Sequence, residues 1–289
     1  MQELGGRVAV ITGAASGFGR EFARLGASQG MKLVLADVDR EGLAALEREL
    51  AGTPCITVLT DVSRAEDIAN LAQRTMKEFG AAHLLFNNAG VGSGGLIWES
   101  SLADWQWVLG VNLWGVIHGV REFVPLMLAQ DCECHIVNTA SVAGLLSPPG
   151  MGVYNVSKHA VVTLSETLFH DLRLAGSKIG TSVLCPAFVP TGIHQSERNR
   201  PDELRNTEPL TASQRMARDA TAKAVTSGRV TAAQVAELTF EAIRANRFYV
   251  LSHPKILDSV GLRLQDILAL RNPSDPFTYK PGVAPRSGA

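Results

Sequence analysis

The sequence predicts an α/β fold in which a doubly wound parallel sheet of about seven strands forms one domain. Short apolar runs alternate with helical stretches along most of the chain, which is typical of strand–helix–strand units with helices on both faces of a sheet. Hydrophobic residues make up 46% of the 289 residues, whereas aromatic residues make up only 6%. A core of small aliphatic side chains is usual for a parallel sheet that helices cover.

The individual elements follow from apolar runs and from helical spacing. The run RVAVIT ends in glycines and predicts the first strand, and Phe18, Phe22 and Leu25 then fall on one side of a helix. Asp39 is placed to cap the helix that begins near Arg40. The expected strands are 7–12, 32–36, 55–60, 83–86, 135–139, 181–185 and 248–251. The expected helices are 17–30, one from residue 40, 64–79, 102–129, 151–175 and 230–246.

The chain is expected to form a single domain over residues 1–271. Residues 188–228 stand apart because they include a polar stretch with Pro201 and Pro209 but without strong periodicity. A stretch of this kind inside a compact domain is usually functional, and we expect it to be a lid over the substrate. Residues 272–289 are rich in Pro, Gly and Ser and are expected to form a tail on the surface or against a partner subunit.

Charge and cysteine content exclude several classes of protein. The formal net charge is −1, so no general attraction to nucleic acid or acidic membranes is expected. No apolar run reaches the length of about 18 residues that spans a bilayer, and no leader peptide is apparent. Cys132 and Cys134 lack the further ligands of a metal site, and Cys55 and Cys185 fall in strand-like runs. We therefore expect a cytoplasmic protein without a bound metal.

A glycine-rich turn follows the first expected strand. It runs Thr12-Gly13-Ala14-Ala15-Ser16-Gly17-Phe18-Gly19, with the spacing G-x-x-x-G-x-G. Glycines allow a tight turn and let a diphosphate approach the N-terminus of the next helix, where free N–H groups favour anions. Such a run alone indicates only a tight turn, but its place between a strand and a helix predicts dinucleotide binding.

Asp37 ends the second expected strand and selects the type of dinucleotide. A carboxylate here can accept hydrogen bonds from both hydroxyls of the adenosine ribose, and it repels a 2′-phosphate. The neighbouring Ser16 and Val38 supply no positive charge, although Arg40 follows closely. The sequence therefore favours NAD over NADP.

Tyr154 and Lys158 form a candidate acid–base pair. A free phenol has a pKa of about 10, and a lysine one helical turn away is expected to lower it by favouring the phenolate. Ser141 offers a hydroxyl to orient a substrate oxygen. The spacing Y-x-x-x-K is also common on solvated helices, so the interpretation depends on Ser141 and on the upstream dinucleotide motif.

Together these residues resemble the short-chain dehydrogenase/reductase family over about residues 5–253. Five motifs stand in the family's order: TGAASGFG at 12–19, Asp61-Val62, NNAG at 87–90, Ser141 with Tyr154 and Lys158, and PAFVPT at 186–191. The resemblance implies a single-domain Rossmann-type fold. It also implies assembly as a homodimer or homotetramer through the helices at 102–129 and 151–175.

The resemblance assigns roles that the residues alone do not. Asn112 would hold a water against Lys158, which would itself bind the nicotinamide ribose. The further cofactor contacts that it implies are Asp61, Val62, Asn88, Ala89, Gly90, Pro186, Val189 and Thr191. One position departs from the family, which commonly has glycine where this chain has Ala187.

The sequence thus predicts reversible hydride transfer between NAD and a secondary alcohol or ketone, with Tyr154 as general base. Apolar loops favour an aromatic, alicyclic or steroid-like substrate, with contacts expected from Leu96, Ala143, Met151 and Phe188. Arginines in the expected lid could meet an acidic substrate group or form a solvated helix face; these are Arg198, Arg200, Arg205 and Arg215. The alternatives are an NAD-binding sensor without turnover and a sugar epimerase or dehydratase. The retained tyrosine and lysine disfavour the sensor, and the loop spacing disfavours the sugar enzymes.

Overall fold

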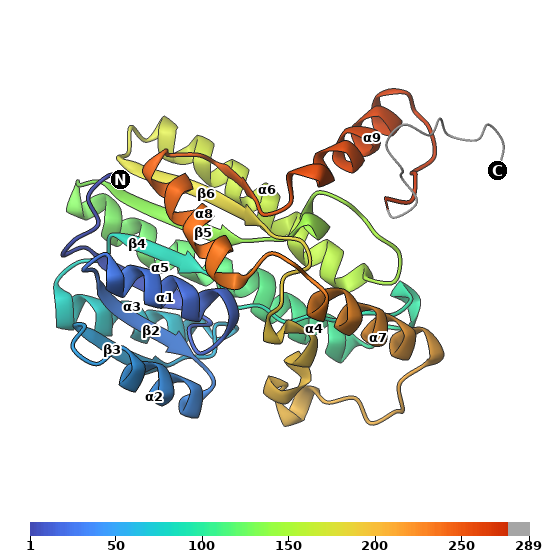
Figure 1. Ribbon diagram of the computed structural model, residues 1–289, viewed down its shortest axis with the longest axis horizontal. Coiled ribbons are helices and arrows are strands. Elements are labelled where there is room, and N and C mark those ends of the chain that lie inside the picture. The colour runs from blue at the N-terminus through green and yellow to red at the C-terminus, as the bar shows by residue number, and fades with distance from the viewer. Residues whose placement is uncertain (277–289) are drawn as a thin grey trace.

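Seven parallel strands form the centre of the molecule in the order β3-β2-β1-β4-β5-β6-β7 (Figure 1). The computed structural model describes residues 1–276, so the end of the predicted tail at 272–289 lies outside the described residues. The strands are β1 Val8–Thr12, β2 Lys32–Asp37, β3 Cys55–Leu59, β4 Leu84–Asn87, β5 Cys134–Thr139, β6 Ile179–Cys185 and β7 Tyr249–Leu251. Every predicted strand is confirmed to within about two residues at each end, and so is the predicted fold class.

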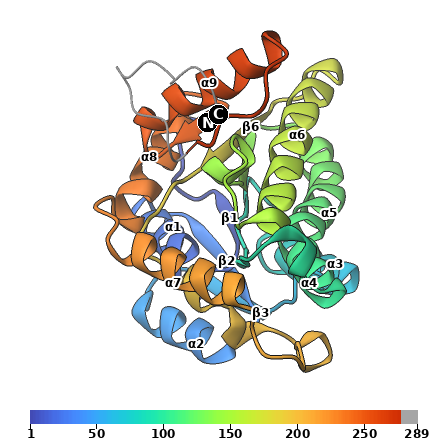
Figure 2. The same cartoon turned by 90° about the vertical axis from the view of Figure 1, so that its right-hand side faces the viewer.

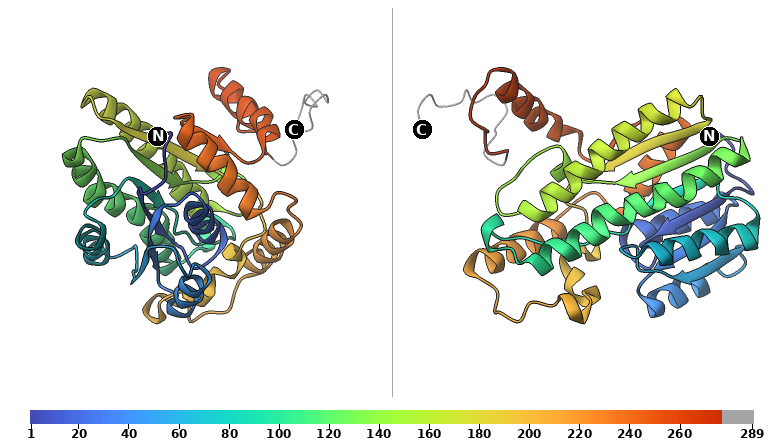
Figure 3. Two further views of the ribbon diagram at one scale, coloured as in Figure 1. Left: turned by 60° about the vertical axis from the view of Figure 1, so that its left-hand side comes forward. Right: turned by 180° about the vertical axis from the view of Figure 1, so that it is seen from behind.

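Helices cover both faces of this sheet. α1, α2 and α8 lie on one face, and α3, α5 and α6 lie on the other (Figures 2 and 3). Asp39 caps α2 as predicted, because its side chain accepts a hydrogen bond from the backbone N–H of Gly42. The helices are α1 Gly17–Ser28, α2 Arg40–Glu49, α3 Ala65–Phe79, α4 Leu102–Leu109, α5 Gly115–Gln130, α6 Gly152–Leu174, α7 Ala212–Thr226, α8 Ala232–Arg244 and α9 Leu257–Leu268.

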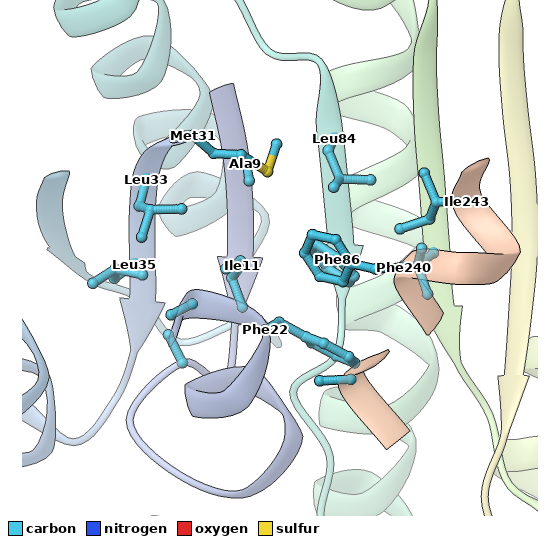
Figure 4. Close-up of a cluster of buried hydrophobic side chains, with 14 of the residues drawn as sticks. Ala9, Ile11, Phe22, Met31, Leu33, Leu35, Leu84, Phe86, Phe240 and Ile243 are labelled. Carbon is cyan, nitrogen blue, oxygen red and sulfur yellow. The ribbon is translucent and has the colours of Figure 1, made fainter. Parts of the chain in front are cut away.

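An aromatic stack joins the sheet to the face that α1 and α8 cover. Phe22 of α1 stacks on Phe86 of β4 with 4.4 Å between ring centroids, and Phe86 lies 5.8 Å from Phe240 of α8 (Figure 4). All three side chains are buried. Full burial of a phenylalanine contributes roughly 2–3 kcal/mol, so this stack fixes α1, whose N-terminus faces the candidate site.

Three helical features differ from the sequence prediction. The helix expected at 102–129 is divided by a π-helical turn at Gly110–Trp114. The expected lid is more regular than predicted, with short 3-10 helices at 192–199 and 202–204 followed by α7. The helix α9 was not predicted, and it stands away from the body of the molecule in Figure 1. Within residues 1–276, no helix is both long and apolar enough to cross a membrane.

A buried histidine makes the fold sensitive to acid. His135 of β5 is 1% exposed, and its Nε2 lies 2.8 Å from the Oγ of Ser182 on β6. That hydroxyl donates to the carbonyl of Arg247, so its oxygen accepts the Nε2–H of the neutral ring. Burial, which disfavours the imidazolium, lowers the pKa of His135 to about 3.

We therefore expect the protein to lose stability as the pH falls below about 6.5. In that range His135 is protonated in the unfolded chain but stays neutral in the folded state, so acid favours unfolding. The expected loss between pH 6.5 and pH 5 is about 2 kcal/mol, since each pKa unit corresponds to about 1.4 kcal/mol. Urea unfolding of the wild type and of His135→Gln at both pH values measures it. An equally steep pH dependence in the variant would contradict this assignment.

Candidate active site

A pocket of about 1150 Å³ opens at the carboxyl ends of the strands, beside α4 and α7. Parallel strands end at one edge of their sheet, so residues that follow different strands meet here. Most of the predicted catalytic and cofactor residues line it: Gly13, Ser16, Gly17, Phe18, Asp37, Asp61, Val62, Asn88, Ala89, Gly90, Ser141, Tyr154, Lys158, Pro186, Val189 and Thr191. Thr12, Gly19 and Asn112 lie behind this lining.

The glycine-rich turn after β1 is packed against the backbone of the loop after β4. A Cβ placed on Gly13 would lie 2.9 Å from the Cα of Ala89, and one on Gly19 would collide with the carbonyl oxygen of Gly13. Gly17 begins α1 with a φ of 53°, and Ser16 before it makes no side-chain capping hydrogen bond. The first N–H groups of α1 therefore face the pocket without a side-chain cap, which suits an anion.

Thr12 and Asn88 hold these two loops together. The Thr12 hydroxyl accepts hydrogen bonds from the backbone N–H groups of Asn88 and Ala89, at 2.9 and 3.2 Å. The Asn88 side chain donates to the carbonyl of Thr12 at 3.0 Å. Thr12 is thus a positioning residue, and a ligand in the pocket meets Asn88, Ala89 and Gly90 instead.

Two carboxylates mark the end of the pocket near β2 and β3. Asp37 accepts hydrogen bonds from the N–H groups of Ala15 and Asp39, at 2.9 and 3.0 Å. Burial raises the pKa of Asp37, and these hydrogen bonds oppose the shift. Asp61 accepts from both the N–H and the hydroxyl of Ser63. Each carboxylate is held in place by local backbone contacts while it lines the pocket.

Ser141, Tyr154 and Lys158 come together from the end of β5 and the first turns of α6. The Ser141 hydroxyl accepts from the N–H of Ala143 at 3.1 Å, donates to the carbonyl of Pro186 at 3.3 Å, and lies near the Tyr154 side chain. The Lys158 Nζ donates to the carbonyl of Thr139 at 2.9 Å and lies 5.7 Å from the centre of the Tyr154 ring. All three side chains are buried. The arrangement can hold an oxygen atom between a hydroxyl and a phenol, close to a buried amine.

The predicted lowering of the tyrosine pKa is not what this structure shows. Burial raises the pKa of Tyr154 to about 12, although the nearby Ser141 hydroxyl opposes the shift. Burial also lowers the pKa of Lys158 to about 8, so the ammonium that was expected to favour the phenolate is itself destabilised. The spacing of the pair could be read from the sequence, but its desolvation, which acts on both groups, could not.

Asn112 occupies the π-helical turn between α4 and α5, and its side chain is fully buried. Its Oδ1 accepts from the N–H of Val91 at 2.8 Å, while its Nδ2 donates to the carbonyl of Val91 and to the hydroxyl of Ser157. Turns of this kind are frequent at functional sites. Here Asn112 joins the loop after β4 to the helix that carries Tyr154 and Lys158.

The segment after β6 closes one side of the pocket. A Cβ placed on Gly17 would lie 3.4 Å from the Cβ of Thr191, so this segment contacts the glycine-rich turn. The backbone N–H of Ala187 donates to the hydroxyl of Ser252 at 3.1 Å, a hydrogen bond that alanine forms as well as glycine. Of the predicted substrate contacts, Ala143, Met151 and Phe188 line the pocket. Leu96 is not among the lining residues and is 36% exposed.

The sequence missed the cluster that anchors the lid. Arg200 is 5% exposed, contrary to a solvated helix face, and its Nη2 lies 2.8 Å from the Oδ1 of Asp104 on α4. Its guanidinium lies 4.8 Å above the ring of Trp107, which is buried as expected of a packing tryptophan. Trp98, in contrast, is 77% exposed. Asp104, Trp107 and Arg200 all line the pocket, whereas Trp98 does not.

A second contact fixes α7, the lid helix. The Glu99 carboxylate accepts hydrogen bonds from the hydroxyls of Thr211 and Ser213. Thr211 also forms a capping box with Gln214 at the start of α7. The pattern T-x-x-Q is the signal by which the sequence could have revealed this helix.

Known proteins are similar to this chain in sequence and in fold. The family model for short chain dehydrogenase matches residues 7–202. The chain is 34% identical over 272 residues to the CLA biosynthesis dehydrogenase/reductase of Lactiplantibacillus plantarum. The alignment covers 93% of this chain and 95% of that protein. It is 31% identical over 281 residues to the C alpha-dehydrogenase of a Sphingobium species, covering 96% and 90%. A crystal structure of a short chain dehydrogenase/reductase from Burkholderia phymatum in complex with NAD matches with a TM-score of 0.95 and 60% identity, covering 96% of this chain and all of that one.

Arg200→Met is expected to destabilise the protein by about 3 kcal/mol, because it leaves the buried carboxylate of Asp104 without its cation. Arg205→Met is the matched control, since its pair with Asp202 is exposed and contributes at most about 1 kcal/mol. Chemical denaturation of both variants measures the difference. Equal stabilities would show that the buried pair does not anchor the lid.

Proposed function

We propose that this protein transfers a hydride reversibly between NAD and a secondary alcohol or ketone. The chain belongs to the short-chain dehydrogenase/reductase family and is an oxidoreductase that acts on CH–OH groups. The observation that carries the proposal is one continuous pocket. It joins the uncapped start of α1 and the Asp37 carboxylate to Ser141, Tyr154 and Lys158. A dinucleotide site and an acid–base group must share one cavity if a hydride is to pass between cofactor and substrate.

The residues of the pocket fit NAD. Glycine is required at positions 13 and 19, where a side chain would meet backbone, and this close packing leaves the start of α1 open to a diphosphate. The Asp37 carboxylate is placed to accept hydrogen bonds from two ribose hydroxyls and would repel the 2′-phosphate of NADP. The related protein from Burkholderia phymatum was crystallised in complex with NAD, which supports the same choice here.

Bound NAD would supply the hydride acceptor. In the proposed mechanism Ser141 donates a hydrogen bond that orients the substrate oxygen, and Tyr154 takes the hydroxyl proton of an alcohol or returns one to a ketone. Lys158 lies close enough to stabilise the phenolate while its amine is protonated, which its pKa of about 8 permits at neutral pH. Asn112 is a positioning residue in this mechanism, since its hydrogen bonds hold the loop at Val91 against α6.

The apolar side chains near Tyr154 favour an apolar substrate. Leu146, Pro148, Met151 and Phe188 line the pocket at this end. Such a surface holds an aromatic, alicyclic or steroid-like frame by burial of its area, with the reacting oxygen at Ser141 and Tyr154. A panel of secondary alcohols of these classes, assayed with NAD at neutral and alkaline pH, tests the proposal. Tight NAD binding without turnover of any of them would instead favour a sensor.

Tyr154→Phe is expected to lower turnover at least about a hundredfold, because a positioned general acid–base group contributes about 10²–10⁴ to the rate. The affinity for NAD should change by less than about twofold, since the ring that lines the pocket is retained. NADH absorbance gives the rate, and titration calorimetry gives the affinity.

Tyr249→Phe is the matched control for this variant. Tyr249 donates its hydroxyl to Glu166 at the edge of the sheet and does not line the pocket, so its loss should leave turnover intact. A Tyr154→Phe enzyme with more than a tenth of the wild-type rate would refute the proposed acid–base role.

We also propose that the protein assembles as a homodimer or homotetramer through α4, α5 and α6. Large apolar side chains stand exposed on these helices and on the π-helical turn between α4 and α5: Leu102 is 87% exposed, Trp114 49%, Leu128 42% and Val156 45%. Exposed apolar side chains that gather on one surface mark interaction sites.

Light scattering is expected to give two or four times the mass of one 30.9 kDa chain. Leu102→Glu together with Trp114→Glu should lower that mass. Met216→Glu on α7, where the side chain is 73% exposed, should leave it unchanged. A wild-type protein of 30.9 kDa in solution would contradict the proposal.

A further inference from the structure

The guanidinium of Arg198 has a fixed place at the edge of the pocket. Arg198 lies near the end of the 3-10 helix Gly192–Asn199, and its Nη1 donates to the carbonyls of Gly192 and Gln195, both at 3.0 Å. A Cβ placed on Gly192 would lie 3.3 Å from the Nη2 of Arg198. The side chain is thus folded back on the start of its own helix, although it is exposed to solvent.

That place adjoins the start of α1. Gly192 follows Thr191, whose Cβ and methyl group would lie 3.4 and 3.5 Å from a Cβ on Gly17. Gly17 is the first residue of α1, where the N–H groups carry no side-chain cap. Ser16, Gly17, Thr191, Gly192 and Arg198 all line the same pocket. A short path of direct contacts therefore links the guanidinium to the proposed site for the cofactor diphosphate.

Three of the other cations that line the pocket are engaged elsewhere. Arg200 pairs with Asp104 and Glu197, Arg205 pairs with Asp202, and Lys158 donates to Thr139. Arg198, in the part of the chain that the structure describes, bonds only to carbonyl oxygens, so its charge is not neutralised by a carboxylate.

A guanidinium has five N–H donors, and in Arg198 both hydrogen bonds to carbonyl oxygens are donated by Nη1. The donors on Nη2 and Nε make no hydrogen bond within residues 1–276. Arginine presents such donors in a planar fork that matches two oxygens of a phosphate. The free side of this guanidinium can therefore bind a phosphate in the pocket that the start of α1 also lines.

We propose that Arg198 binds the diphosphate of the dinucleotide from the lid side, opposite the N-terminus of α1. This role rests on the proposed function, since it requires NAD in the pocket. It assigns to the lid a residue that holds the cofactor, and it means that the bound diphosphate stabilises the segment 192–199 in the position that it has here. Bound cofactor then determines the position of the lid before the substrate binds.

Calorimetric titration of Arg198→Met with NAD, ADP and adenosine tests this role. We expect the Kd for NAD and for ADP to rise about tenfold or more, because charge-assisted hydrogen bonds to phosphate are lost. The Kd for adenosine, which has no phosphate, should stay within about twofold of the wild type. The loss for NAD should shrink as salt is raised, since salt screens this exposed charge in the wild type. Arg198→Lys should recover part of the affinity.

Arg218→Met provides the matched control. Arg218 also lines the pocket and makes no ion pair within residues 1–276, but it lies on α7 next to Ala217, which packs against Gly94. Its loss should leave the Kd for NAD unchanged. An unchanged NAD affinity in Arg198→Met, or an equal loss for adenosine, would overturn the assignment to the diphosphate. A wild-type protein that binds no NAD would instead refute the proposed function itself.

Discussion

The close approach of backbone to backbone at Gly13 is the constraint on which the site depends. The turn after β1, the start of α1 and the loop after β4 meet there without room for a side chain at positions 13 and 19. Thr12 and Asn88 add hydrogen bonds across the same junction. The wall continues at Gly90, where an added Cβ would lie 3.4 Å from Asn112 and 3.5 Å from Lys158. One packing arrangement thus aligns the proposed nucleotide end of the pocket with its proposed catalytic end.

Burial then determines the chemistry of the aligned groups. Desolvation raises the pKa of Tyr154 and lowers that of Lys158, so it favours the neutral form of both. The pKa of the buried Tyr154 phenol therefore responds strongly to charge. A positive charge that enters a poorly solvated pocket favours the phenolate far more than it would in water. The acid–base strength of the tyrosine is therefore a property of the filled pocket and not of the helix spacing alone.

The sequence predicted the sheet and the pocket lining well because both depend on local patterns. Apolar runs bounded by glycines define the strands, and the motif positions follow the strand ends, where parallel topology brings them together. Arg200 and Asp104 could not be paired in the same way, since they are 96 residues apart and each looks like an ordinary surface charge. The π-helical turn at Asn112 also escaped prediction, because its residues have the same apolar spacing as the helix around it.

The order of the strands divides the pocket between two parts of the chain. Residues before about 63 supply the glycine-rich turn, Asp37 and Asp61, whereas Ser141, Tyr154 and the lid all come later. The early part is packed so tightly that an added methyl group at Gly13 or Gly19 has no space, but the lid consists of loops and one helix on the surface. Substitutions in the lid can therefore change which substrate is recognised while the glycine-rich turn, Asp37 and Asp61 stay unchanged. A library built to change the substrate should randomise lid positions other than Arg198 and Arg200 and leave the first 63 residues untouched.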